Sequence, residues 1–161
     1  MHIHYISEQN SILNHFLAQI RDVNIQKDSM RFRKNIERIG EIMAYELSKT
    51  LDYKEIDVQT PLGIKHTTTI AEPVVLCSIL RAGLALHQGF MSFFDNAENG
   101  FVSAYRHHYD NDDKFEILVE YQAAPSFEGK NLILIDPMLA TGQSLVAVLH
   151  KLHLEQKPKE I

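Results

Sequence analysis

The sequence predicts a single α/β domain, residues 1–161, with a mainly parallel twisted sheet flanked by helices and a protruding β-hairpin arm. Two aliphatic runs, 74-VVLCSIL-80 and 132-LILI-135, lack the polar–apolar alternation of a half-exposed strand, which indicates strands buried on both faces. Amphipathic helical segments alternate with these runs, as expected for a parallel sheet. The length of 161 residues suits one domain.

The remaining elements follow from their local patterns. The first helix is expected to start at Asp28 or Ser29, because apolar residues then recur at helical spacing from Met30 to Leu47, up to about Leu51. Two more helices are expected at 84–94 and 144–157. The predicted strands are 74–80, 101–106, 115–122 and 132–135, with a polar tip, 110-DNDDK-114, joining the second to the third.

The hairpin arm is expected at residues 56–70, where two β-branched runs flank Pro61-Leu62-Gly63. Its Thr and Ile residues would be better buried against a partner strand or subunit. We therefore expect a homodimer or a higher homo-oligomer.

The composition is that of an ordinary globular protein, with 45% hydrophobic and 23% charged residues. A net charge of -5 argues against a nucleic-acid binder, which is usually basic. No apolar run approaches the ~18 residues that span a bilayer, and the first residues lack the features of a signal peptide. The lone Cys77 lies in an aliphatic run, which fits a reduced core. We expect a cytoplasmic protein that binds neither nucleic acid nor membrane.

The stretch 132-LILIDPMLATGQS-144 places Asp136 at the end of a buried strand, where ligands of open α/β sheets bind. The small and hydroxyl residues that follow lead into a helix, whose free N–H groups and dipole suit a phosphate. A carboxylate beside that phosphate site favours a ligand with hydroxyl groups, so a sugar phosphate meets both demands. From spacing alone, a plain strand–turn–helix connection capped by Asp136 stays open as the alternative.

The same stretch resembles the phosphoribosyl pyrophosphate (PRPP) loop of type I phosphoribosyltransferases. Most branches carry a second acid after the first, but Asp136 is followed by Pro137, which is similar to the uracil phosphoribosyltransferase branch. The segments 79-ILRAGL-84 and 105-YR-106, and the RFR within Lys27–Arg33, match that branch in the same order. The hairpin around 59-QTPLG-63 resembles the arm that embraces a neighbouring subunit there. The resemblance runs from about Ile25 to the end of the chain.

The resemblance implies three catalytic residues. Asp136 would accept hydrogen bonds from the ribose hydroxyls, and Arg81 and Arg106, each at a strand end, would neutralise the departing pyrophosphate. Either arginine alone would be interpreted as a surface residue. The PRPP-binding residues implied are Arg81, Arg106, Asp136, Pro137, Met138, Leu139, Ala140, Thr141, Gly142, Gln143 and Ser144.

The implied reaction is the transfer of phosphoribose from PRPP to uracil, giving uridine monophosphate (UMP) and pyrophosphate in pyrimidine salvage. Mg²⁺ is expected to be bound through PRPP, without a metal cage built by the protein. The pairs His107-His108 and His150/His153 have no third ligand at a convincing spacing, so they are expected to be surface histidines.

Two alternatives stay open. One is a phosphoribosyltransferase for a purine base or orotate, against which Pro137 speaks. The other is a non-catalytic regulator that senses PRPP or pyrimidine nucleotides and binds RNA; the sequence offers little basic surface for RNA, which argues against it. No role is assigned to the basic residues Lys27, Arg31 and Arg33.

The family continues with another strand and a glycine-rich segment that recognises uracil. No such segment follows Ile161 in the sequence. We therefore expect no uracil-binding residues within these 161 residues and poor transfer to uracil by them.

Overall fold

The structure is a computed structural model that describes residues 3–108 and 115–161, without the side chains of residues 106–108, 115–117 and 153–155. The predicted polar tip 110-DNDDK-114 lies outside these residues. The helices are α1 (Ile12–Arg21), η1 (Ile25–Lys27), α2 (Ser29–Ser48), α3 (Leu84–Met91) and α4 (Gln143–Glu155). The strands are β1 (Tyr53–Thr60), β2 (Gly63–Ile70), β3 (Val74–Leu80), β4 (Glu98–Ser103), β5 (Tyr105–His108), β6 (Phe115–Leu118), β7 (Gln122–Ala123) and β8 (Asn131–Ile135).

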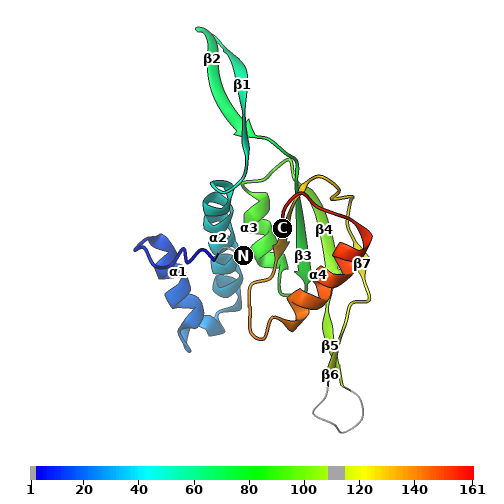
Figure 1. Ribbon diagram of the computed structural model, residues 1–161. Helices are drawn as coiled ribbons and strands as arrows, with labels where there is room; N and C mark the ends of the chain where they lie inside the picture. Colours follow the sequence, from blue (N-terminus) through cyan, green and yellow to red (C-terminus); the bar gives the residue numbers. More distant parts are fainter. Residues whose placement is uncertain (1–2, 109–114) are drawn as a thin grey trace.

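The central sheet has the strand order β7-β4-β3-β8. Strand β3 runs parallel to β4 on one side and to β8 on the other, whereas the short β7 is antiparallel to β4. The carboxyl ends of β3, β4 and β8 therefore lie along one edge of the sheet (Figure 1). The mainly parallel sheet predicted from the sequence is confirmed.

Helices cover both faces of the sheet, with α2 and α3 on one face and α4 on the other (Figure 1). Successive side chains of β3 enter opposite cores: Leu76 belongs to the cluster of Leu86 and Phe90, and Cys77 belongs to the cluster of Val148. All five are at most 3% exposed. Complete burial of one such aliphatic side chain contributes roughly 1.5–3 kcal/mol. This two-sided burial explains the uninterrupted aliphatic run.

Helix α2 begins where the sequence predicts, because the Asp28 carboxylate accepts a hydrogen bond from the Arg31 N–H at 3.0 Å. Helix α1, which was not predicted, contacts α2 through a hydrogen bond from buried Asn35 Nδ2 to Gln19 Oε1 at 2.7 Å. Met30, expected among the periodic apolar residues of the helix, is 63% exposed.

Several predicted helix ends were wrong by a few residues. Helix α2 ends at Ser48 instead of Leu51, and α3 ends at Met91 instead of residue 94. Helix α4 spans Gln143–Glu155, not residues 144–157. Its early end agrees with Pro158, which disfavours helical backbone in the residue before it.

The strands predicted at 101–106 and 115–122 are each divided in two. The chain leaves the central sheet at Ala104, and β5 and β6 form a separate antiparallel pair. At the division, the Tyr121 N–H donates to Ser103 Oγ at 3.0 Å and the Ser103 N–H donates to the Tyr121 carbonyl at 2.9 Å. This break depends on contacts between distant residues, so the local pattern does not mark it.

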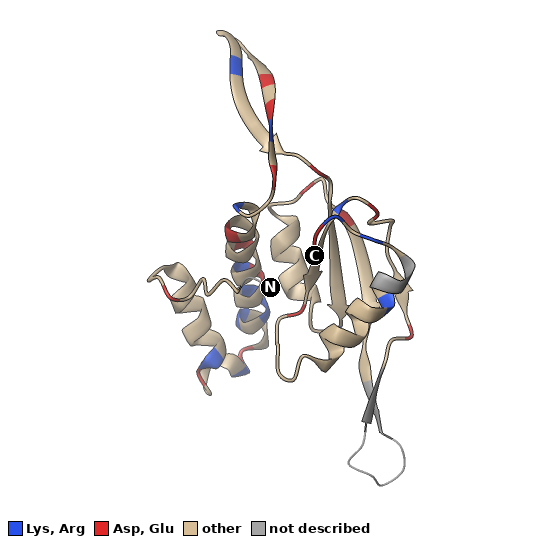
Figure 2. Ribbon diagram, viewed as in Figure 1, with Lys and Arg blue, Asp and Glu red and all other residues tan. Residues whose placement is uncertain are grey.

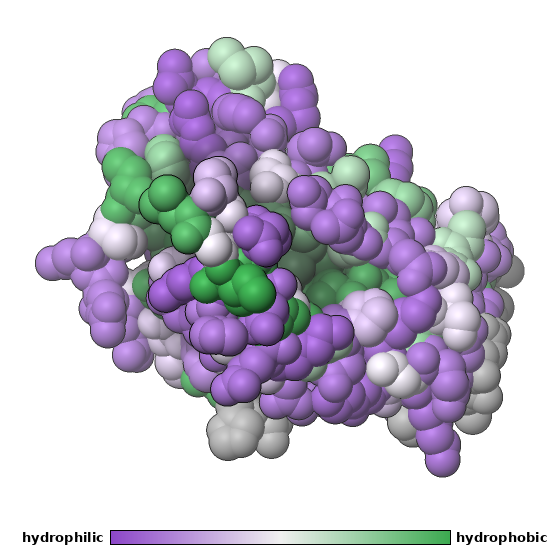
Figure 3. Space-filling model, turned by 90° about the horizontal axis from the view of Figure 1, so that it is seen from above, coloured by the Kyte–Doolittle hydropathy of each residue, from purple (hydrophilic) through white to green (hydrophobic). Residues whose placement is uncertain are grey.

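Strands β1 and β2 form the predicted arm, which starts at Tyr53 rather than residue 56 and projects from the body of the molecule (Figure 1). Gly63 follows the turn with φ of 135°, a conformation that favours glycine. Since β2 leads directly into β3, the arm leaves the sheet at its amino edge, opposite the carboxyl ends of the strands. Seen from the arm side, the surface is mostly hydrophilic, with apolar side chains gathered in a hollow (Figure 3).

No helix in the described part of the chain is both long enough and apolar enough to cross a membrane.

Candidate active site

Three connections meet at the carboxyl edge of the sheet, where ligands of open α/β sheets bind. Residues 81–83 follow β3, Ala104 follows β4, and residues 136–142 follow β8. Because β3 lies between β4 and β8, the connection that carries Arg81 has one of the others on each side. The strand order thus brings Arg81 and Asp136 to neighbouring positions.

Gly83 brings the Arg81 connection into close contact with the end of β8. A Cβ added to the buried Gly83 would lie 3.0 Å from the Ile135 carbonyl oxygen and 3.2 Å from Ser78 Cβ. A residue with a side chain does not fit this approach without a shift of the backbone. The segment that carries Arg81 therefore packs directly on the residue before Asp136.

A cavity of about 870 Å³ lies beside the Arg81 connection. Residues near the ends of β3 and β4 and before β7 line it, namely Leu80, Arg81, Ala82, Ser103, Ala104, Tyr105 and Tyr121. The exposed side chain of Arg81 forms no hydrogen bond or ion pair with the residues that the structure describes. Its guanidinium donors are therefore available to an anionic ligand. The peptide bond between Leu80 and Arg81 is cis.

Arg106 follows Tyr105, which lines the cavity, and its backbone pairs with Ile117 in the β5–β6 hairpin. The side chain of Arg106 lies outside the described part of the structure. Its contact with pyrophosphate stays a prediction.

Asp136 directly follows β8 and is partly buried. Burial raises the pKa of its carboxyl group above the ordinary value, and the hydrogen bond from the Met138 N–H, at 3.5 Å, acts in the opposite direction. One long hydrogen bond leaves most of the acceptor capacity of the carboxylate available to the hydroxyl groups of a ligand.

The amino end of α4 follows this connection. Its N-cap, Gly142, has a left-handed backbone with φ of 76°, which favours glycine. The Gly142 N-cap has no side chain to cap the helix, and the Gln143 N–H makes only a long hydrogen bond, of 3.5 Å, to the Thr141 hydroxyl. The first N–H groups of α4 are open to a ligand, and the helix dipole favours an anion there.

The predicted site residues fall into two groups around β3. Arg81 lines the cavity on the β4 side, whereas residues 136–144 do not line this cavity and lie on the β8 side. Met138 and Leu139 are each 74% exposed, so this second group forms an open shelf rather than an enclosed pocket. A ligand that bridges the two groups has to extend across the end of β3.

Two tyrosines at the cavity had no role assigned from the sequence. A side-chain hydrogen bond with the Glu120 carboxylate raises the pKa of Tyr105 above its ordinary value. Tyr121 reaches the cavity through its backbone pairing with Ser103. Tyr105 stands in the matched Tyr-Arg motif, but no sequence signal marks Tyr121, whose place depends on the pairing of distant segments.

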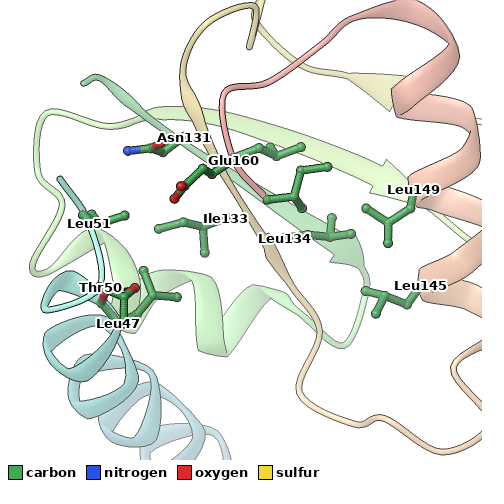
Figure 4. Close-up of a pocket in the computed structure, with 11 residues that line it drawn as sticks. Leu47, Thr50, Leu51, Asn131, Ile133, Leu134, Leu145, Leu149 and Glu160 are labelled. Atoms are coloured by element: carbon green, nitrogen blue, oxygen red, sulfur yellow. Dashed lines mark hydrogen bonds between the residues drawn. The ribbon is translucent and has the colours of Figure 1, made fainter. Parts of the chain in front are cut away.

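A second pocket, of about 350 Å³, lies along the outer edge of β8 (Figure 4). Apolar side chains such as Leu47 of α2, Ile133 of β8 and Leu149 of α4 line it. At one end, Glu160 forms an isolated parallel bridge with Asn131. No predicted catalytic residue lines this pocket.

Charged residues of both signs lie along α2 and the arm, whereas α3 has none (Figure 2). Arg31 forms an exposed ion pair, at 3.5 Å, with Asp28, the N-cap of α2. Such an exposed pair contributes about 0–1 kcal/mol to stability. The basic residues Lys27, Arg31 and Arg33 line neither pocket.

Comparison with solved structures defines the class of the protein. A protein from Aquifex aeolicus has a similar structure, with a TM-score of 0.79 and 29% identity, over 94% of this chain and 72% of that one. A hypoxanthine phosphoribosyltransferase from Staphylococcus aureus has a TM-score of 0.56 over 80% of this chain and 60% of that one. At 17% identity, this likeness shows the fold alone. The molecule has the phosphoribosyltransferase fold.

Sequence comparison then shows the family. The model of the family "Uracil phosphoribosyltransferase" matches residues 6–161. A uracil phosphoribosyltransferase from Porphyromonas gingivalis is 47% identical over 161 residues, all of this chain and 74% of that protein. Another, from Methanothermobacter thermautotrophicus, is 36% identical over 92% of this chain and 68% of that protein. The chain belongs to the uracil phosphoribosyltransferase family. The match to the family model begins at residue 6, so the expected start near Ile25 was wrong and α1 is part of the family domain.

Proposed function

We propose that this protein transfers phosphoribose from PRPP to uracil, producing UMP and pyrophosphate in cytoplasmic pyrimidine salvage. Membership of the family supports this reaction. The structural observation that carries the proposal is the contact of Gly83 with the end of β8, which sets an unpaired arginine and a partly buried carboxylate at adjoining strand ends. An extended ligand with phosphates at both ends and hydroxyls between them fits this arrangement.

The two sides of β3 would hold different parts of PRPP. On the β8 side, Asp136 accepts hydrogen bonds from the ribose hydroxyls, and the amino end of α4 receives the 5-phosphate. On the β4 side, Arg81 would bind pyrophosphate in the cavity, and Arg106 is proposed as a second pyrophosphate-binding residue. The residues proposed for the shelf are Asp136, Pro137, Met138, Leu139, Ala140, Thr141, Gly142, Gln143 and Ser144.

The reaction breaks the bond from the anomeric carbon to the pyrophosphate oxygen and forms a bond from that carbon to a ring nitrogen of uracil, which releases its proton. Negative charge grows on the leaving pyrophosphate while positive charge grows on the ribose. Arg81 and Arg106 would stabilise the first, and the Asp136 carboxylate would hold the ribose in position. Positioning and charge neutralisation therefore account for most of the proposed rate enhancement.

Mg²⁺ fits this site as an ion carried by the substrate. Within the described residues, no three His, Cys, Asp or Glu side chains are grouped so as to hold a metal. Mg²⁺ commonly binds through substrate phosphates and waters, with few protein ligands. When bound, it would supply further neutralisation of the pyrophosphate charge.

We also propose that the protein assembles as a homodimer or higher homo-oligomer through its arm. The strands β1 and β2 pair with each other, and Leu62 and Ile64 at the tip are 100% and 62% exposed. A long hairpin with apolar residues at its tip gains stability when a second subunit covers it.

Calorimetric titration with PRPP and Mg²⁺ tests the proposed site. Asp136→Ala is expected to weaken binding by about 10- to 100-fold, because hydrogen bonds to charged groups contribute about 1.5–3 kcal/mol. The matched control is Asp95→Ala, an exposed aspartate in the connection from α3 to the amino end of β4, at the edge of the sheet opposite the carboxyl ends. Equal weakening by both variants, or no binding by the folded wild type, contradicts the proposed site.

The base is tested separately. Pyrophosphate release from PRPP is measured with uracil, hypoxanthine, guanine and orotate in parallel. The bases are compared by their relative rates, whatever the absolute rate: release that is fastest with uracil supports the proposed reaction, and release that is fastest with a purine base or orotate assigns the chain a different base.

A further inference from the structure

Two buried polar side chains face each other between α3 and β3. Ser78 and His87 are 0% and 3% exposed, and the Ser78 Oγ lies 2.7 Å from His87 Nδ1. The other ring nitrogen, Nε2, lies 2.8 Å from Asn99 Oδ1, and the Asn99 side-chain amide donates to the Ala97 carbonyl at 3.2 Å. The network therefore runs from the core to the amino end of β4.

This network fixes the hydrogen-bonding roles of His87. The Asn99 amide nitrogen is directed at a carbonyl, so its oxygen faces the ring and His87 Nε2 carries the proton. In this neutral form Nδ1 is an acceptor, and the Ser78 hydroxyl donates to it. The Phe101 ring packs against the imidazole with centroids 5.0 Å apart. The contacts with Ser78, Asn99 and Phe101 together fix the position of the imidazole ring.

The Ser78 end of the network leads to the site. Ser78 is paired with Ile135 in the parallel register, one residue before Asp136. The Ser78 Cβ lies 3.2 Å from the position that a Cβ added to Gly83 would occupy. The His87 N–H donates to the Gly83 carbonyl oxygen at 2.8 Å. The backbone bond belongs to the first turn of α3, and the side chain of His87 joins that turn to β3 beside the end of β8.

The Asn99 end leads away from the site. Asn99 is paired with Leu76, nearer the amino end of both strands, and its residue is exposed to solvent. The net contribution of one hydrogen bond to stability is small, and an apolar side chain would fill the position of His87 as well. The hydrogen bond to Ser78 instead fixes a position: because its geometry is directional, it permits one placement of α3 relative to β3.

We propose that His87 is a positioning residue for PRPP binding. Through Ser78 it fixes Gly83 on the end of β8, and so sets the distance between the Arg81 guanidinium and the Asp136 carboxylate. It touches neither substrate nor the reacting atoms. The proposal rests on the proposed function, since the two groups matter together when one PRPP molecule bridges them.

The test compares two variants that each remove one hydrogen bond of the same imidazole. Ser78→Ala removes the bond that leads to the site, and Asn99→Ala removes the bond that leads away from it. For both, PRPP affinity is measured by calorimetry with Mg²⁺, and the free energy of unfolding is measured in urea. Backbone amide shifts of Gly83 and Asp136, recorded by NMR without ligand, report the position of the connection directly.

We expect Ser78→Ala to weaken PRPP binding about tenfold, with shifts at Gly83 and Asp136, and Asn99→Ala to stay within about twofold of the wild type. Equal loss of affinity in the two variants, or a loss that follows the unfolding free energy alone, overturns the proposal. Binding by the wild type and unchanged binding by Ser78→Ala overturns this inference and leaves the proposed function intact. No PRPP binding by the folded wild type overturns both.

If Ser78→Ala fails to fold, the PRPP affinity of the double variant Ser78→Ala/His87→Met is compared with that of the wild type and Asn99→Ala instead. Replacing both partners by apolar groups leaves no unpaired donor or acceptor between α3 and β3, and methionine adapts to the space of the imidazole. The double variant is expected to fold and still to bind PRPP about tenfold more weakly. Wild-type affinity in this variant overturns the role of His87.

Discussion

The Cα atom of Gly89 lies 3.2 Å from the point that a Cβ on Gly40 would occupy, so α2 and α3 cross with their backbones almost in contact. The approach is closer in the other direction: a Cβ on Gly89 would lie 2.1 Å from the Glu37 carbonyl oxygen. This crossing fixes α3 from the side opposite the sheet. Helix α3 is thus held by a backbone contact on one face and by the His87 network on the other.

Gly89→Ala is therefore expected to lower the free energy of unfolding by about 3 kcal/mol, because neither backbone can yield without moving a helix. Urea denaturation followed by circular dichroism measures the change. Gln88→Ala, at the exposed neighbouring position of α3, is the control and is expected to stay within about 0.5 kcal/mol of the wild type. Similar stabilities of the two variants would mean that the helices can separate at little cost.

The elements that the sequence predicts best are those whose pattern is local. The aliphatic run of β3 shows two-sided burial, and Pro61-Leu62 before Gly63 marks the turn of the arm. The division at Ala104 has no such mark, because pairing between Ser103 and Tyr121 decides it. The same holds for Tyr121 at the cavity.

For the site, the sequence marks residues at strand ends and not the contacts that place them. Arg81 and Asp136 stand out because each follows an aliphatic run. The order of β4, β3 and β8, which sets them side by side, is decided by long-range pairing. The hydrogen bond between Ser78 and His87 joins a strand to the following helix, and nothing in the spacing of those two residues distinguishes it from ordinary packing.

Arg81→Gln is expected to weaken PRPP binding by about 10- to 100-fold and to leave the free energy of unfolding within about 0.5 kcal/mol of the wild type. The exposed guanidinium makes no bond with the described residues, so its loss removes no contact from the folded protein. Calorimetry and urea denaturation measure the two quantities. Arg33→Gln, an exposed arginine on α2, should leave PRPP binding unchanged. A large loss of stability with Arg81→Gln would assign this side chain a structural role instead.

Asp136→Asn is expected to weaken PRPP binding at least about tenfold while making the protein slightly more stable at neutral pH. Burial raises the folded-state pKa of this carboxyl above 3.8, so the stability associated with its protonated form is full below about 3.8 and is lost as the pH rises through the raised value. The ionised carboxylate therefore costs stability at neutral pH, and asparagine removes that cost. Thermal melts at pH 4 and pH 7 should show the gain at pH 7 alone; a variant less stable at pH 7 contradicts this.

If the protein assembles through its arm as proposed, replacing residues 57–68 by a short turn is expected to convert the oligomer into monomers. The arm pairs with itself and exposes apolar residues at its tip, so a partner subunit is the surface that would bury them. Light scattering of the intact and shortened proteins at equal concentration measures the mass. The single substitution Leu62→Ser, which keeps the hairpin, should weaken association without abolishing the arm. An unchanged mass after the replacement would place the interface elsewhere.

His87 predicts a change of stability with pH. Its burial lowers the folded-state pKa below the ordinary 6.5, and the hydrogen bond to Asn99 opposes this in part. A lowered folded pKa means that the stability contributed by neutral His87 is full above about pH 6.5 and is lost as the pH falls through the folded value. Ser78, Asn99 and Phe101, which surround the ring, do not titrate, so His87 alone accounts for this part of the dependence.

The measurement is the free energy of unfolding of the wild type and of His87→Met at several values between pH 5 and pH 8. The wild-type value should fall more steeply than that of the variant below pH 6.5, by up to about 1.4 kcal/mol per pH unit, which is the limit for one proton. Gln88→Ala, which leaves the imidazole and its partners in place, should keep the wild-type slope. Parallel curves for the wild type and His87→Met would show that the imidazole takes up its proton as readily in the folded protein as in the unfolded chain, which contradicts this prediction.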